Sequence, residues 1–153
     1  ATPFAFAAHI ALVEVDPGTG DIRLVRYAAV HDCGLMINPR IVRGQIQGGI
    51  TQGIGQALSE AVFHDGDGQP LAGSFMTYGL PHTESTPDFV LEHLQTPSPT
   101  NPLGIKGIGE LPTVASPVAV ANAVVDALSG YGVRHLDMPI SPEAVWHALN
   151  SQA

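Results

Sequence analysis

The stretch Ile41–Phe63, IVRGQIQGGITQGIGQALSEAVF, is the longest periodic segment of the sequence, and the other elements are best understood around it. Apolar residues recur at every fourth position, which predicts a helix with one face toward a core; they are Val42, Ile46, Ile50, Ile54, Leu58 and Val62. Five glycines interrupt the same stretch, namely Gly44, Gly48, Gly49, Gly53 and Gly55. Each glycine costs a helix roughly 0.5–1 kcal/mol relative to alanine. We therefore expect another group to approach this helix backbone closely.

Strand patterns lie on both sides of this helix. His9–Asp16 and Ile22–Val30 alternate apolar and polar residues around the turn sequence PGTGD, which predicts a β-hairpin. Further strands are predicted at Gly73–Pro81, after the tight turn DGDG, and at Asp88–Gln95.

Two more helices are predicted beyond the Pro- and Gly-rich loop Thr96–Gly109. The first is expected to begin at Ser116–Pro117, with serine as the N-cap and proline at the first helical position, and to end at Gly130. The second runs from Ser141 to Leu149. Hairpins mixed with helices predict an α+β fold in a single domain, residues 1–153, with β-hairpins packed against the Gly-rich helix and the C-terminal helices.

Composition narrows the function classes. Apolar residues make up 44% of the 153 residues and charged residues only 13%, which indicates a folded chain with part of its surface covered by a partner. The formal net charge of −8 argues against binding to nucleic acid or anionic membranes. The apolar opening has no basic residues ahead of it, and no apolar run is long enough for a membrane span, so we expect neither a signal peptide nor a transmembrane helix.

Metal and thiol chemistry receive little support from the residues alone. The seven histidines are scattered without the spacing of a metal site. Cys33 is the single cysteine, which excludes an internal disulfide and any all-cysteine cluster and is consistent with a reducing, cytoplasmic setting. With no third group to orient a Cys33–His31 pair, we expect Cys33 to be a packed loop residue.

The loop NPLGIKGIGE, Asn101–Glu110, ends in a carboxylate that follows two glycines. Glu110 is either a general base beside a ligand held by Gly107 and Gly109, or a solvated glutamate that caps the next helix. A dinucleotide-binding site of the Rossmann type is not expected here, because Pro112 stands where the third glycine of G-x-G-x-x-G would lie.

Three stretches in this order carry a family resemblance: HDCGLMINPRIVRGQIQGGITQGIGQAL (31–58), GSFMTYGLP (73–81) and TPSPTNPLGIKGIGELPTVASPVAVANAVVDAL (96–128). As a set they resemble the molybdopterin-binding large subunit of the molybdenum hydroxylases, the family of xanthine dehydrogenase, aldehyde oxidase and aerobic carbon monoxide dehydrogenase. The sequence of these stretches is most similar to the bacterial carbon-monoxide-dehydrogenase-like branch. The resemblance covers essentially the whole chain and looks like the C-terminal portion of the molybdopterin-binding domain.

The resemblance implies roles for individual residues. Glu110 matches the catalytic glutamate, the base for oxidative hydroxylation of an aldehyde, N-heterocycle or similar small substrate, or for CO oxidation. The expected cofactor-binding residues are Gly48, Gly49, Gln52, Gly53, Lys106, Gly107, Ile108 and Gly109. Asp32, Asn38 and Pro39 match positions that we interpret as loop architecture. No protein ligand to the metal is expected, because the pterin's own sulfurs hold molybdenum in this family.

The resemblance also implies cofactors and partners. The cofactor would be molybdopterin with molybdenum, in its cytosine dinucleotide form, with iron–sulfur and FAD groups only on partner chains. The partners would be the remaining part of the large subunit and the iron–sulfur and flavin subunits. The alternative is a non-catalytic structural subunit or degenerate fragment that only packs against a partner chain. Both KGIGE and TQGIG are intact, which favours a molybdenum-containing oxidoreductase that is active only with a partner chain.

Overall fold

The computed structural model describes residues 3–150, whose strands form one three-stranded mixed sheet. β1 (Phe6–Val15) and β2 (Ile22–Asp32) form the predicted antiparallel hairpin. β3 (Phe89–Leu94) pairs in parallel with the other edge of β2, so the strand order is β1-β2-β3. The hairpin and the strand at β3 were predicted, but the parallel pairing was not. It arises because the chain crosses from β2 to β3 through a helix.

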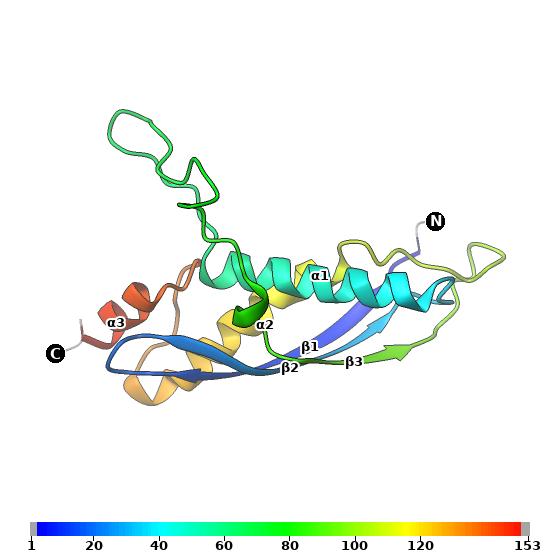
Figure 1. Ribbon diagram of the computed structural model, residues 1–153. Coiled ribbons are helices and arrows are strands. Elements are labelled where there is room, and N and C mark those ends of the chain that lie inside the picture. The colour runs from blue at the N-terminus through cyan, green and yellow to red at the C-terminus, as the bar shows by residue number, and fades with distance from the viewer. Residues whose placement is uncertain (1–2, 151–153) are drawn as a thin grey trace.

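The helices complete an α+β fold, as predicted from the sequence. α1 (Pro39–Leu58) and α2 (Leu111–Ala127) cover one face of the sheet, and α3 (Pro142–Asn150) lies at the end of the described chain (Figure 1). The short 3₁₀ helices η1 (Thr83–Ser85) and η2 (Ser129–Tyr131) precede β3 and follow α2. No helix within residues 3–150 is long and apolar enough to cross a membrane.

Two buried clusters hold these layers together. The larger cluster lies between the sheet and the helices and is formed by Leu24, Tyr27, Ala29, Cys33, Val42, Ile46, Ile50, Ile54, Ala57 and Val120. The smaller joins α2 to the C-terminal segment and is formed by Val124, Leu128, Val133, Ile140 and Val145. The predicted apolar stripe is thus confirmed from Val42 to Ile54.

Two glycines of α1 lie where another part of the chain closely approaches the helix backbone, as the sequence predicted. A Cβ atom at Gly49 would lie 2.9 Å from Pro112 Cβ, and one at Gly53 would lie 2.5 Å from Ser116 Cβ. Both values are below normal van der Waals contact, so alanine does not fit without movement. The group that approaches the backbone at these two glycines is therefore α2.

Gly53→Ala is expected to lower the free energy of unfolding by about 1–3 kcal/mol, the usual cost of overpacking a core. The added methyl would meet Ser116 Cβ at 2.5 Å and Pro117 Cδ at 2.8 Å. Gly44→Ala is the matched control, because no atom lies within 4 Å of its Cβ position. It should raise the same free energy by about 0.5–1 kcal/mol through helix propensity. Chemical denaturation followed by circular dichroism measures both, and equal effects from the two variants would contradict the packing argument.

Two predictions after α1 are wrong. The helix was expected to reach Phe63, but it ends at Leu58, where the backbone N–H groups of Ser59 and Glu60 both donate to Gly55 O. Within the described residues, no strand forms at Gly73–Pro81. Residues 74–78 form a turn instead. This stretch has no neighbouring strand to pair with, and its serine and threonine side chains favour turns through local hydrogen bonds.

The predicted start of the second helix is also wrong. α2 begins at Leu111, five residues before the expected N-cap Ser116. Ser116 is fully buried inside the helix and donates its hydroxyl to Ile50 O of α1 at 2.8 Å. By contrast, α3 begins as predicted, because Ser141 Oγ accepts from the N–H of Ala144 at 3.1 Å.

Candidate functional site

Glu110 occupies the N-cap position of α2 and is exposed. Its side chain makes no capping hydrogen bond to the helix, so the capping role considered for it is not seen. Its carboxylate forms no hydrogen bond or ion pair with any other residue in the range 3–150. An exposed carboxylate without a protein partner is available to a ligand or a reacting group.

The loop that leads to Glu110 is fastened to the end of β2 by Lys106. The backbone N–H of Lys106 donates to Cys33 O at 2.8 Å, and its ammonium lies 3.2 Å from Asp32 Oδ1. A further bridge pairs Gly34 with Ile105. The loop predicted to surround the cofactor is therefore held by contacts to residues about 70 positions earlier in the chain.

Asp32 is the electrostatic centre of this attachment. Its side chain is 1% exposed, and burial alone would raise its pKa. Hydrogen bonds from Thr96 and Gly34 and the ammonium of Lys106 outweigh burial and hold the pKa of Asp32 well below its usual range. The same ammonium lies 4.4 Å from the centre of the Phe6 ring, a cation–π contact. This supports the interpretation of Asp32 as loop architecture.

Beyond Lys106, the loop presents backbone donors. Among the hydrogen bonds of residues 3–150, none is donated by the backbone N–H of Gly107, Ile108 or Gly109. Gly107 and Gly109 are exposed, and the three residues lead directly into the N-terminus of α2. Unpaired N–H groups at a helix N-terminus attract anionic and oxygen-rich groups.

A cavity of about 380 Å³ lies beside Glu110. It is lined by Gln56, Glu110, Thr113, Val114, Pro117, Val118 and Met138. Thr113 Oγ1 donates to Gln52 Oε1 at 3.3 Å across the contact between α2 and α1. The cavity therefore combines a carboxylate with amide and hydroxyl groups on a mostly apolar floor, which is the usual composition of a small-molecule site.

The predicted glycines divide into two groups. Gly48 is exposed with no atom within 4 Å of its Cβ position, so a ligand can approach it. Gly49 and Gly53 are buried beneath α2 and allow the two helices to touch. This contact brings the N-terminus of α2, and Glu110 with it, next to Gln52.

Sequence reasoning missed Gln56 and Thr113. Gln56 lies four residues after Gln52 and so on the same face of α1, which is the signal that could have identified it. Thr113 lies one turn after Glu110, but the wrong helix start hid that relation.

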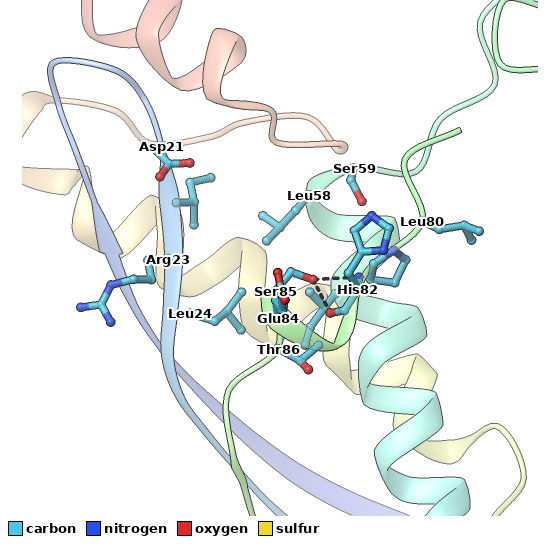
Figure 2. A pocket seen from close by; sticks show the side chains of 13 residues that line it. Asp21, Arg23, Leu24, Leu58, Ser59, Leu80, His82, Glu84, Ser85 and Thr86 are labelled. Carbon is cyan, nitrogen blue, oxygen red and sulfur yellow. Dashed lines mark hydrogen bonds between the residues drawn. The ribbon is translucent and has the colours of Figure 1, made fainter. Parts of the chain in front are cut away.

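A more voluminous cavity, about 540 Å³, lies between β2, the end of α1 and the segment around η1. Figure 2 shows Leu24, Leu58 and His82 among the side chains that line it. None of the site residues predicted from the sequence lines this cavity. Glu110 lines the smaller cavity and not this one.

Three histidines that are far apart in the sequence meet on the inner face of the sheet. His9 Nε2 lies 3.0 Å from His31 Nε2, and His93 is the strand partner of His31. Burial lowers the pKa of both His9 and His31 to about 4, so they are neutral at pH 7. Within residues 3–150, no group of three or more His, Cys, Asp or Glu side chains is arranged to hold a metal ion.

Cys33 is 2% exposed and belongs to the main core cluster, as expected for a packed loop cysteine. Burial is the main reason why the pKa of its thiol is raised. A thiol with a raised pKa is a poor nucleophile at neutral pH.

Comparisons with known proteins agree on one family. Residues 1–87 match the family model of the molybdopterin cofactor-binding domain. The nicotine 6-hydroxylase large subunit of Paenarthrobacter nicotinovorans is 42% identical over 145 residues, which cover 95% of this chain and 18% of that protein. The carbon monoxide dehydrogenase large chain of Hydrogenophaga pseudoflava is 40% identical over 146 residues, with the same coverage of 95% and 18%.

A solved structure supports the same assignment. Quinoline 2-oxidoreductase from Pseudomonas putida 86 superimposes with a TM-score of 0.87 at 45% identity, over 92% of this chain and 18% of that chain. The chain thus spans less than a fifth of the length of these relatives. It belongs to the molybdopterin cofactor-binding domain family of the molybdenum hydroxylase large subunits.

Proposed function

We propose that this chain forms one wall of the molybdopterin site of a molybdenum-containing hydroxylase or dehydrogenase and supplies Glu110 as the general base. The observation that carries the proposal is the exposed carboxylate of Glu110, which has no partner within residues 3–150 and lines a cavity. The substrate would be an aldehyde, an N-heterocycle or a similar small molecule, or CO. The working enzyme would be cytoplasmic, with iron–sulfur and FAD groups on other chains.

The residues around Glu110 suit an oxygen-rich cofactor. The unpaired N–H groups of Gly107–Gly109 directly precede Glu110, and Gln52 accepts a hydrogen bond from Thr113 of the cavity lining. Together with the amide of Gln56, which lines the cavity, these N–H groups and the Gln52 amide would offer donors to the cofactor. These residues would hold the molybdopterin, in its cytosine dinucleotide form, and Gly48 would allow it close to α1. When bound, the cofactor supplies the molybdenum redox chemistry.

The chain's own contribution to the reaction is proton handling and positioning. Glu110 would accept a proton at its carboxylate oxygen from the oxygen nucleophile. The apolar side chains of Val114, Pro117 and Val118 would limit water around it once the second wall covers them. The contact between α1 and α2 and the Lys106–Asp32 attachment fix the backbone that carries Glu110. Positioning of this kind is as important to the rate as the basicity of the group.

Molybdenum and pterin should be found in the assembled enzyme that contains this chain and not in the isolated chain. Small-molecule sites bury about 70–90% of their ligand, whereas Gly107, Gly109 and Glu110 lie exposed on this chain. The measurement is metal analysis together with pterin fluorescence after oxidative release, on both preparations at equal protein concentration. An assembled enzyme without molybdenum and pterin would refute the proposed function, and an isolated chain that retains both would refute the need for a second wall.

A further inference from the structure

Residues 61–81 form an arm that leaves the end of α1, projects away from the sheet and helices, and returns toward η1 (Figure 1). The arm contains one isolated β-bridge, between His64 and Pro70. The projection places the arm outside both core clusters. Nothing in the fold of residues 3–150 thus requires the arm for core packing.

The arm carries large apolar side chains that the rest of the chain leaves uncovered. Phe75 is 88% exposed and Met76 is 95% exposed. Val62, Phe63 and Leu71 on the same arm are each more than half exposed. Isolated apolar side chains are common on protein surfaces, but several on one projection mark an interaction site.

Hydrogen bonds give the arm a defined shape. Asp65 Oδ1 accepts from the backbone N–H groups of Asp67 and Gln69 at 3.0 and 2.9 Å. The N–H of Leu71 donates to Phe63 O at 2.8 Å, which closes the first half of the arm. An arm with its own hydrogen bonds loses less conformational entropy on binding than a disordered segment.

The base of the arm is clamped to the end of α1. Ser59 Oγ donates to Gly79 O at 2.5 Å, and the hydroxyl of Tyr78 donates to Glu60 Oε2 at 3.0 Å. The N–H of Tyr78 donates to Ser74 O at 2.9 Å and forms the turn that presents Phe75. The turn and the clamp together fix the direction in which Phe75 and Met76 point.

We propose that this arm packs Phe75 and Met76 into an apolar surface of the remaining part of the large subunit, formed by residues outside these 153. The proposal rests on the proposed function only in taking the rest of a large subunit to be present. The relatives are long enough to contain such a surface, because the segment that matches this chain is only 18% of their length. A sparsely charged chain, with 13% charged residues, fits such a permanent contact.

Charge disfavours a second copy of this chain as the occupant. The arm contains Asp65 and Asp67 and no lysine or arginine, and the whole chain has a formal net charge of −8. Two such arms that met, or an arm that met the acidic chain of a second copy, would bring like charges together. An apolar surface of different sequence carries no such penalty.

Photo-crosslinking in the assembled enzyme tests the occupant directly. Benzoylphenylalanine in place of Phe75 should crosslink to a peptide of the remaining part of the large subunit, outside residues 1–153, as identified by mass spectrometry. A crosslink to a second copy of this chain or to an iron–sulfur or flavin subunit, or no crosslink at all, would overturn the proposal. The crosslink requires neither molybdenum nor turnover, so a failure here and a failure of the proposed function are distinguishable.

Hydrogen exchange of the assembled enzyme gives a second measurement. The double variant Phe75→Ser/Met76→Ser should increase the exchange rates of amides in residues 73–78 at least ten-fold, because the anchoring side chains are gone. Asp67→Ser on the same arm is the matched control and should leave those rates unchanged. Equal exchange rates in the double variant and the unmodified enzyme would show that the arm is not anchored by these side chains.

Discussion

Glu110→Gln in the assembled molybdenum enzyme is expected to lower kcat by about 10²–10⁴-fold, the usual contribution of a general base. The amide keeps the size and hydrogen-bonding capacity of the side chain but cannot accept the proton. Because the Glu110 side chain makes no capping bond and no ion pair within residues 3–150, its replacement should leave the fold unchanged. Molybdenum and pterin content should also remain at the level of the unmodified enzyme.

Asp126→Asn provides the control for this variant. It makes the same carboxylate-to-amide change at an exposed position near the other end of α2. Steady-state kinetics and metal analysis of both variants separate a chemical role from a loss of cofactor. Retained turnover in Glu110→Gln, with cofactor present, would remove Glu110 from the mechanism and favour the non-catalytic alternative.

Asp32→Asn is expected to lower the free energy of unfolding by about 3–5 kcal/mol, because it leaves the buried ammonium of Lys106 without its counter-charge. Both side chains are almost fully enclosed, at 1% exposure for Asp32 and 6% for Lys106. Lys106→Met should cost less, since Asp32 would keep its N–H donors from Gly34 and Thr96. Chemical denaturation at pH 7 measures the order of the two effects.

Glu14→Gln is the matched control, because Glu14 forms an ion pair with Arg23 in which both side chains are about two-thirds exposed. Exposed pairs of this kind contribute about 0–1 kcal/mol, so the free energy of unfolding should hardly change. A loss in Asp32→Asn no larger than in Glu14→Gln would contradict the role of the buried pair.

Lowering the pH should reduce the difference in the free energy of unfolding between Asp32→Asn and the unmodified protein. The pKa of Asp32 is lowered in the folded state, so its stabilising effect is complete above the ordinary carboxyl pKa of about 4 and is lost as pH falls further. His9 and His31 have pKa values lowered to about 4, so stability already declines from about pH 6.5 downward as the unfolded chain takes up their protons. Both proteins share the histidine effect, and their difference therefore isolates Asp32.

Local patterns in the sequence were good guides where the environment was also local. The four-residue apolar stripe predicted the buried face of α1, and alternation predicted the hairpin of β1 and β2. The same reasoning failed at Ser116, where a Ser-Pro pair normally starts a helix. Ser116 instead donates to Ile50 O on another helix, a partner that no local pattern reveals.

For the candidate site, the sequence identified Glu110 and the glycines of its loop, but not what surrounds them. Gln56 and Thr113 line the same cavity only because α1 and α2 cross beside Glu110. Residues 73–81 of the arm were mistaken for a strand, since a strand-like stretch of sequence does not show whether another strand is available to pair with it.

The sequence by itself determined the helical stripe of α1, the hairpin, and the loop that ends in Glu110, since periodicity and glycine content act over a few residues. Only the tertiary structure decided that α2 fills the space over Gly49 and Gly53, and that Lys106 pairs with Asp32, 74 positions earlier. The physical reason is that close packing and buried charge pairing depend on which distant surfaces meet. That information lies in the three-dimensional contacts between segments and not within any one of them.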